Sequence, residues 1–397
     1  MLWRVKMDNY YKIREFHCTT KAKHGVGALS SLADSIKELE GNKPLIVTDP
    51  GVVAAGLLEM VTRKLEEAAI EYAVFDQVVP NPYIETVGQA TRVYTDSNCD
   101  CLIGLGGGSS MDTAKGVGVE VTHDGNILKW EAAERDLERR IAPLITIPTT
   151  AGTGSEVTVW AVITDPDRKF KFNVGGPLLA PHIAIVDPTL HASMPPHVTA
   201  GTGMDALCHA IECYTCHYAQ PHTDAAALLA IEYCGNYLRR AVGNGQDMEA
   251  RYYMAIAAHL AGVSYGTESA GAVHALTQTL GGIKPEIHHG PAVGSTLGAF
   301  MEYNWIGRPK KFRRVAQALG VDVNGLSDHD ACLLGAEAVY ELAEDIDIPS
   351  LGDLGVKEED IPLLAREAAN DPQTPGNPRD IDASGYEWMY KRCLGLI

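Results

Sequence analysis

The sequence predicts an α/β N-terminal dinucleotide-binding domain with a parallel sheet, followed by an all-helical C-terminal metal-binding domain. Up to about residue 190, short β-branched apolar runs alternate with helical stretches, which is typical of a parallel sheet covered by helices on both faces. After Asp187-Pro188, apolar residues recur at helical spacing and β-branched runs become scarce. We therefore expect two domains, at residues 1–190 and 191–397, with ligands bound in the cleft between them.

The individual elements follow from the length and spacing of the apolar runs. In the first half, we expect strands at residues 43–48, 71–75, 101–105, 143–147 and 183–186, and helices at residues 56–69 and 86–96. In the second half, we expect helices at residues 199–218, 223–238 and 247–265, and over most of residues 309–369.

Composition and charge exclude several classes of protein. The 397 residues are 46% hydrophobic and 21% charged, which is a globular composition. The formal net charge is −18 and the longest basic run is Lys310-Lys311, so we expect no nucleic-acid partner and no anionic membrane. A membrane span needs about 20 consecutive apolar residues, which this sequence lacks, and its start has no secretion pattern. With nine scattered cysteines, we expect reduced thiols in a cytoplasmic protein.

A glycine-rich turn is the first feature that carries chemistry. Residues 104–115 read GLGGGSSMDTAK, follow an apolar strand and open a predicted helix. Three adjacent glycines lack side chains, so backbone N–H groups can approach a diphosphate at the positive end of the helix. The pattern is neither the dinucleotide fingerprint nor a P-loop, but the polar residues that follow favour a ligand site over a plain turn.

Two other strands also end in polar residues. Asp49 follows the strand at residues 43–48, where a carboxylate can accept a hydrogen bond from a ribose and would repel a 2′-phosphate, favouring NAD over NADP. An N-cap for the next helix, beside Pro50-Gly51, explains Asp49 equally well. Residues 147–156 read IPTTAGTGSE, and these small and hydroxyl side chains suit a loop that lies against a cofactor.

A set of possible metal ligands lies in the second half. Asp205 and His209 are four residues apart on a predicted helix, so their side chains project from one face. His274 and the pair His288-His289 come later in the chain. One carboxylate and three imidazoles suit iron or zinc and leave a position for a substrate oxygen. A purely structural Asp/His pair is the competing explanation.

Together these motifs resemble the iron-containing, group III alcohol dehydrogenase family over nearly the whole chain. The resemblance also includes residues 25–29, 79–82, 184–188, 203–214 and 376–379. It implies an oxidoreductase that interconverts a small primary alcohol and its aldehyde by hydride transfer with NAD(H), mainly as an aldehyde reductase. It further implies Fe2+, with Zn2+ as the alternative, and a homodimer or larger homo-oligomer.

The resemblance also implies roles for individual residues. The metal and catalytic residues would be Asp205, His209, His274 and His289. The cofactor-binding residues would be Asp49, Asn81, Gly106, Gly107, Gly108, Ser109, Asp112, Thr149, Thr150, Thr153, Ser155 and Lys171, with Lys169 as a rival to Lys171.

Two positions depart from the family pattern. The first departure concerns the fourth metal ligand, because the interval after His274 fits His288. The family histidine, however, directly precedes a glycine that starts a helix, which favours His289 before Gly290. We choose His289, because loop 283–287 can accommodate one extra residue. Gln278 stands where many members carry a histidine that is assigned a proton-relay or positioning role. Glutamine cannot titrate, so proton exchange would use water, the ribose hydroxyls or another side chain, such as the non-ligating histidine of the 288–289 pair.

Substrate size and the competing functions remain open at this point. Trp160 resembles a family position that faces the substrate, and Tyr265 is a second candidate lining residue, although core packing explains both equally well. A bulky Trp160 favours short aldehydes. The alternatives are a lyase of the dehydroquinate-synthase-like type, a polyol dehydrogenase on the same architecture, or an inactive nucleotide-binding scaffold. Residues 213–217 match the haem-attachment pattern, but without an export signal we expect Cys213 and Cys216 to be buried thiols.

Overall fold

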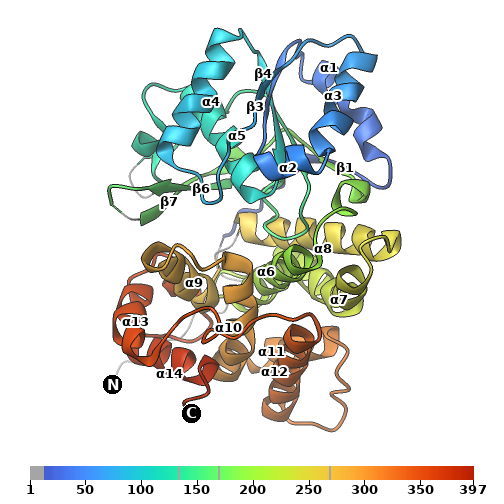
Figure 1. The fold of residues 1–397 in the computed structure, drawn as a ribbon. Coiled ribbons are helices and arrows are strands. Elements are labelled where there is room, and N and C mark those ends of the chain that lie inside the picture. Colours follow the sequence, from blue (N-terminus) through green and yellow to red (C-terminus); the bar gives the residue numbers. More distant parts are fainter. Residues whose placement is uncertain (1–12, 133–134, 169, 268–269) are drawn as a thin grey trace.

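The chain forms a sheet-containing half and a helical half, which face each other (Figure 1). The computed structural model describes residues 13–132, 135–168, 170–267 and 270–397. Within these ranges, every strand lies between residues 21 and 186, and all regular structure after residue 187 is helical. The predicted fold class is therefore confirmed. No helix in the described ranges combines the length and apolarity needed to cross a bilayer.

A six-stranded parallel sheet forms the centre of the first half. Its spatial order is β1-β8-β5-β4-β2-β3. The strands are β1 (Lys21–His24), β2 (Pro44–Val47), β3 (Ala73–Phe75), β4 (Cys101–Gly106), β5 (Leu144–Pro148) and β8 (Ile183–Val186). The inner strands β2, β4, β5 and β8 are buried throughout, which explains why each reads as a continuous apolar run. All five predicted strands are present.

Alternate side chains of the inner strands build a hydrophobic cluster on each face of the sheet. On one face, Ile46 and Ile103 contact α1 (Leu32–Glu38) and α3 (Leu57–Glu67). On the other face, Leu45 and Leu102 join α4 (Ile84–Asp96) and α5 (Gly108–Glu120). The short helix α2 (Pro50–Ala54) follows β2 directly. The sheet is thus covered on both sides, as the sequence predicts (Figure 1).

The sequence analysis missed the edge strand β1 and an antiparallel hairpin. The hairpin pairs β6 (Trp160–Asp165) with β7 (Phe170–Gly175). In β6, Ala161 and Ile163 are buried and their neighbours are partly exposed, which is the alternation typical of a strand. This alternation was not used in the prediction, because the neighbouring segments were interpreted as parts of the cofactor site. β1 has the sequence KAKH and its side chains are mostly exposed, so it shows no apolar pattern from which a strand could be predicted.

The second half is a bundle of helices around α6. The long helices are α6 (Pro196–Thr215), α7 (Pro221–Gly243), α8 (Met248–Thr267), α9 (Ala272–Ile283) and α10 (His289–Asn304). The shorter or peripheral helices are α11 (Pro309–Ala318), α12 (Asp328–Asp345), α13 (Ile361–Ala369) and α14 (Ala383–Cys393). The predicted helices are confirmed with shifted ends. The expected helical run at 309–369 divides into α11, α12 and α13.

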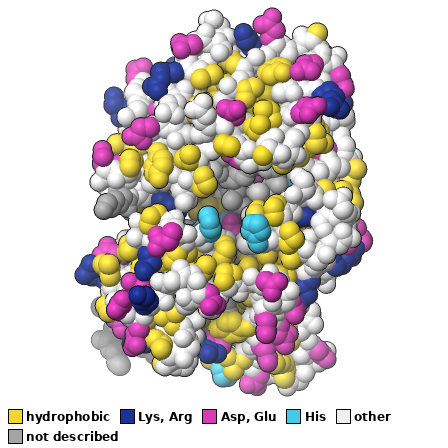
Figure 2. Space-filling model, in the orientation of Figure 1, with side chains coloured by type: hydrophobic (Ala, Val, Ile, Leu, Met, Phe, Trp, Pro, Cys, Tyr) yellow, Lys and Arg dark blue, Asp and Glu magenta, His cyan; other side chains and the backbone are white. Residues whose placement is uncertain are grey.

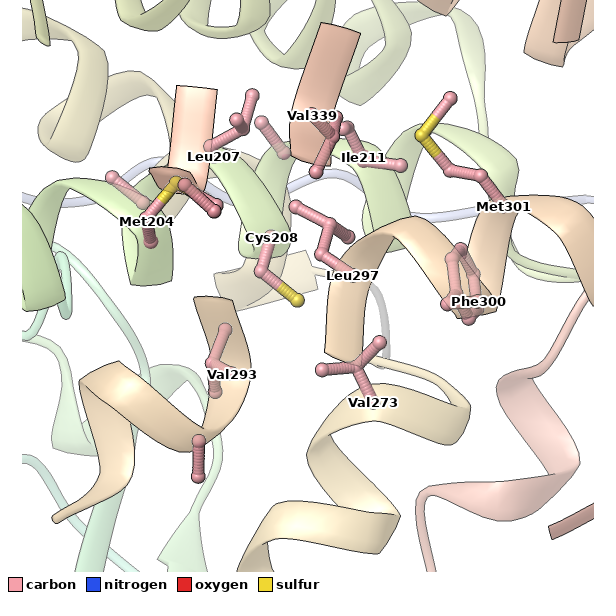
Figure 3. Close-up of a cluster of buried hydrophobic side chains, with 14 of the residues drawn as sticks. Met204, Leu207, Cys208, Ile211, Val273, Val293, Leu297, Phe300, Met301 and Val339 are labelled. Carbon is pink, nitrogen blue, oxygen red and sulfur yellow. The ribbon is translucent and has the colours of Figure 1, made fainter. Parts of the chain in front are cut away.

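Helix α6 runs through the interior of the bundle and contacts α7, α8 and α10. Figure 3 shows the cluster that holds it, with Met204, Leu207, Cys208 and Ile211 of α6 facing Val293 and Leu297 of α10. Almost every residue from Thr199 to Thr215 is buried. Polar side chains on this helix therefore lie inside the protein, where they need partners or ligands. Cys213 and Cys216 are buried, as expected.

Candidate active site

Four side chains from three helices converge on one buried point. Asp205 and His209 lie on successive turns of α6, His274 lies in the first turn of α9, and His289 is the first residue of α10. Relative to Oδ1 of Asp205, Nδ1 of His209 lies at 3.6 Å, Nε2 of His274 at 3.5 Å and Nε2 of His289 at 3.6 Å. The structure thus brings together all four residues that the resemblance implied as ligands.

These separations fit a metal ion. Metal–ligand bonds of about 2.0–2.2 Å place neighbouring ligand atoms of a tetrahedral site about 3.3–3.6 Å apart. Three of the atoms, Asp205 Oδ1, His209 Nδ1 and His274 Nε2, are buried without a hydrogen-bond partner among the described residues. Because buried polar atoms without partners are costly, a divalent cation is the group that satisfies this set.

A close crossing of two helices selects His289 over His288. Gly201 of α6 and Gly290 of α10 touch backbone to backbone, and a Cβ on Gly290 would lie 2.7 Å from the Gly201 carbonyl carbon. Because of this contact, the start of α10 packs closely against α6, and His289 lies near Asp205. His288 is the N-cap residue of α10 and is exposed. The helix start, rather than the sequence interval, therefore decides which histidine faces the cluster.

A buried carboxylate supports His274 from behind. Oε2 of Glu212 lies 2.5 Å from Nδ1 of His274, while Oε1 of Glu212 accepts the backbone N–H of Val273 at 2.8 Å. Glu212 is completely buried. Because the carboxylate is an acceptor, the imidazole donates through Nδ1 and leaves Nε2 free to point at Asp205. The sequence analysis missed Glu212, although it follows His209 on the same helix.

The cluster strongly shifts the titration of its members. Burial by itself would raise the pKa of the Asp205 carboxyl, but the surrounding imidazoles lower it well below its usual range. Burial lowers the pKa of His209 to about 4, against the opposing pull of Asp205. Asp205 is therefore an anion and His209 a neutral imidazole at neutral pH. These are the forms in which both residues ligate metals.

The glycine turn faces this cluster from the sheet half. Gly106 ends β4, and Gly107 is the N-cap residue of α5. The chain runs from β2 out to β3 and then crosses back to β4 on the other side of β2, so the carboxyl ends of β2 and β4 flank a topological switch point. Ligands of open α/β sheets bind at such a crevice, where backbone N–H groups at the start of α5 can hold a phosphate.

The loop after β5 lies directly on this turn. A Cβ on Gly108 would come within 2.9 Å of the Thr153 side chain, and one on Gly107 would lie 3.4 Å from Thr150 Oγ1. Thr149 continues the pairing of the strands, since its N–H bonds to the Gly106 carbonyl. Only backbone-sized groups fit between the turn and the loop.

Asp112 and Ser155 bond to each other at the floor of the cleft. Ser155 donates to Oδ1 of Asp112 at 2.6 Å, and the Val162 N–H donates to Oδ2 at 3.0 Å. Lys115 joins them by bonding to Ser155 and to the Trp160 carbonyl. This network ties α5 to the loop and to β6. Asp112 and Ser155 therefore fix the shape of the cleft floor.

Asp49 is an N-cap and also borders the glycine turn. Its Oδ1 accepts the Val52 N–H at 3.0 Å and caps α2, while its Oδ2 accepts the Ser110 hydroxyl at 3.0 Å. A Cβ on Gly106 would lie 3.0 Å from Oδ2. The N-cap explanation of Asp49 is therefore confirmed, and the same carboxylate borders the glycine turn.

A cavity of about 240 Å³ joins the two halves of the site. From the sheet half, Gly108, Ser109 and Thr153 line it; from the helical half, Asp205, His209, His274 and His289 do. Figure 2 shows histidine side chains at the hollow between the two halves. At its side, Nζ of Lys171 donates to Oδ1 of Asn81 at 2.9 Å, and burial lowers the pKa of Lys171 to about 8. Lys169, the rival candidate, lies outside the described residues.

Known proteins share this architecture along the whole chain. A family model described as "Iron-containing alcohol dehydrogenase" matches residues 19–188, and one described as "Fe-containing alcohol dehydrogenase family, C-terminal" matches residues 199–394. The chain belongs to the iron-containing alcohol dehydrogenase family. It is therefore an NAD-dependent enzyme that interconverts alcohols and aldehydes.

Individual relatives agree. A protein of Bacillus subtilis (strain 168) named "Choline dehydrogenase" is 52% identical over 398 residues, covering 100% of this chain and 99% of that protein. An "NAD-dependent methanol dehydrogenase" of Bacillus methanolicus is 39% identical, covering 93% and 97%. The crystal structure of a 1,3-propanediol oxidoreductase superimposes with a TM-score of 0.93 at 37% identity, covering 96% and 100%. These relatives fit the dehydrogenase function and not the lyase alternative.

Three residues that the sequence left ambiguous line the enzyme's cleft. Trp160, Tyr265 and Gln278 all border the cavity that Asp205 and the three histidines line. The Tyr265 ring lies 4.8 Å from that of His209. Gln278 donates through Nε2 to the Lys171 carbonyl at 3.3 Å, so it braces β7 against α9. This position gives Gln278 a structural contact in place of a titrating group.

Proposed function

We propose that this dehydrogenase oxidises choline to betaine aldehyde with NAD⁺, and that its metal is Fe2+ bound by Asp205, His209, His274 and His289. The observation that carries the choice of substrate is the 52% identity, over the full length of both chains, to the Bacillus subtilis choline dehydrogenase. The cleft agrees with it, because Trp160 and Tyr265 line the cavity beside the metal cluster and aromatic rings favour quaternary ammonium groups.

The residues of the chain divide the chemistry between the two halves. A bound divalent cation would supply Lewis-acid chemistry at the substrate oxygen, and bound NAD⁺ would supply the hydride acceptor. Asp205 and the three imidazoles would hold that cation. The backbone of residues 106–108 and Ser109 hold the cofactor pyrophosphate at the start of α5, with Asp49 at the ribose and Asn81, Thr149, Thr150, Thr153 and Lys171 along the cofactor. Alcohol and NAD⁺ become aldehyde, NADH and one released proton.

The route of that proton differs from a histidine relay at position 278. Gln278 cannot titrate, and His288 is exposed outside the cavity. We infer that the proton leaves through cofactor hydroxyls and water along the open side of the cleft.

We also propose that the protein is a cytoplasmic homo-oligomer. Light scattering coupled to gel filtration measures its oligomeric state directly.

A substrate comparison tests the proposed function. The enzyme is loaded with Fe2+ or with Zn2+ under anaerobic conditions, its metal content is measured, and NADH formation is followed with choline, ethanol, 1,3-propanediol and 3,3-dimethylbutan-1-ol. We expect the highest kcat/KM for choline, in the Fe2+ form. A higher kcat/KM for any uncharged alcohol would overturn the choline assignment, and higher activity with Zn2+ would overturn the iron assignment. Asp205→Ala serves as the control without a metal site.

A further inference from the structure

A second cavity of about 320 Å³ opens directly beside the cleft that contains Asp205 and the three histidines. Trp160, Lys171, Tyr265 and Gln278 line both cavities, so the two are neighbours with shared walls. The remaining wall comes from β7 and from the segment around Gln373. The volume lies within the range of ligand pockets, about 300–1,000 Å³.

Two residues that line this second cavity each carry a side-chain carbonyl oxygen without a hydrogen-bond partner among the described residues. They are Oε1 of Gln373 and Oδ1 of Asn173, and both atoms are buried. Gln373 is only 6% exposed. An unpartnered buried acceptor is costly, and two of them in one cavity indicate a ligand that carries positive charge or donates hydrogen bonds.

A chain of amide contacts fixes which atom of Gln373 remains without a partner. Gln278 must present its Nε2 to the Lys171 carbonyl, because a carbonyl can only accept. Its Oε1 therefore accepts from Nε2 of Gln373 at 2.9 Å. Because Gln373 presents its Nε2 to Gln278, its Oε1 is the atom without a hydrogen-bond partner among the described residues. Gln278, at the position of the family histidine, thus orients an acceptor of the second cavity.

Two aromatic rings remain available to a cation. The guanidinium carbon of Arg168 already lies 5.5 Å from the ring centre of Phe170 and 5.6 Å from that of Phe172. Trp160 and Tyr265 have no such cation in the described structure, and they border both cavities. Trp160 is held in place over Gly175, where a Cβ would lie 2.0 Å from its ring. Tryptophan is the strongest side-chain partner for a quaternary ammonium ion.

We propose that this second cavity is the binding subsite for the quaternary ammonium group of the substrate, formed by Trp160, Tyr265, Asn173 and Gln373. The proposal rests on the proposed function and deepens it. Only two carbon atoms separate the hydroxyl from the nitrogen in choline, so a hydroxyl at the metal cluster places the ammonium at the shared wall of Trp160 and Tyr265. The two amide oxygens then face its positively charged methyl groups.

Charged side chains at the cavity do not cancel this preference. Glu131 and Lys171 both line it and carry opposite charges. Glu131 is paired with Arg168 at 3.0 Å, and Nζ of Lys171 bonds to Asn81 on the side of the first cavity. The amide oxygens of Asn173 and Gln373 carry partial negative charge, so they favour a cation over an anion in this cavity.

The test compares choline with 3,3-dimethylbutan-1-ol, which has the same shape and no charge. In Gln373→Leu, which removes the amide oxygen, we expect the KM of choline to rise about tenfold, which corresponds to about 1.4 kcal/mol, because the cation loses the electrostatic attraction of that oxygen. The KM of the uncharged alcohol should stay within about twofold. Asn173→Asp, which adds a negative charge, should lower the KM of choline only. Gln317→Leu, exposed on α11, is the matched control.

Tetramethylammonium separates this inference from the proposed function, because it has the head group without the hydroxyl. We expect it to inhibit oxidation of propan-1-ol by the wild-type enzyme and to do so less in Gln373→Leu. If choline is not oxidised but tetramethylammonium inhibits in this way, the subsite stands and the choline assignment fails. If choline is oxidised but both substitutions change the two alcohols equally, the subsite is wrong and the proposed function stands.

Discussion

Nδ1 of His274 and Oε2 of Glu212 lie 2.5 Å apart in the interior of the helical half, on the side of the imidazole that faces away from Asp205. The contact joins α9 to α6, and Glu212 also accepts the Val273 N–H, so one carboxylate fixes both the ring of His274 and the start of its helix. Removing this acceptor frees the imidazole to rotate or to change its tautomer, which weakens the ligand.

Glu212→Gln should therefore weaken metal binding by about 10- to 100-fold, the usual effect of losing a hydrogen-bonding partner of a ligand. The dissociation constant is measured by competition with a chelator. Glu156→Gln is the matched control, because Glu156 is another buried carboxylate, 3.1 Å from Nδ1 of His259 and outside the ligand set. Equal metal affinities in the two variants would contradict the supporting role of Glu212.

The adjacent histidines offer a second test of the metal site. His289→Ala should lose the metal and turnover, whereas His288→Ala should keep both, because only His289 lies near Asp205. Metal content and kcat are measured on the same preparations. NADH binding, followed by fluorescence, should survive in both variants because the glycine turn lies in the other half. Retention of metal by His289→Ala, with its loss in His288→Ala, would reverse the assignment.

Asp49 should control the preference for NAD over NADP. Asp49→Asn removes the charge that repels a 2′-phosphate while keeping an N-cap side chain, so kcat/KM with NADP⁺ should rise about tenfold relative to NAD⁺. Asp49→Gly should do the same at a small cost in stability, since glycine replaces a cap at only a few tenths of a kcal/mol. An unchanged cofactor ratio in both variants would assign Asp49 to capping alone.

Lys171 predicts a pH dependence for the cationic substrate. Burial lowers the pKa of this lysine to about 8, so its positive charge is present below that pH and lost above it. Only the charged form repels choline. The KM of choline divided by that of 3,3-dimethylbutan-1-ol should therefore fall as the pH rises through about 8, at saturating NAD⁺. In Lys171→Met the ratio should not depend on pH. The same pH dependence in the variant would assign it to another group.

The sequence was sufficient to predict those features that depend on residues close to one another along the chain. The inner strands read as apolar runs because both of their faces are buried. Asp205 and His209 share a helix face by spacing alone, and the glycine turn follows its strand directly. β1 was not predicted, because its mostly exposed side chains show no apolar pattern. The β6–β7 hairpin was not predicted either, although buried and partly exposed side chains alternate along β6.

The amino-acid sequence by itself determined the inner strands, the long helices, the chemistry of the candidate metal ligands and the family. Tertiary structure decided the rest, because it joins residues that are remote along the chain. The backbone contact of Gly201 with Gly290 brings His289, rather than His288, to the cluster. Gln278 and Gln373 are 95 residues apart, yet their contact orients an acceptor in the second cavity. No local pattern encodes such contacts, since they arise only when the helices and the hairpin pack together.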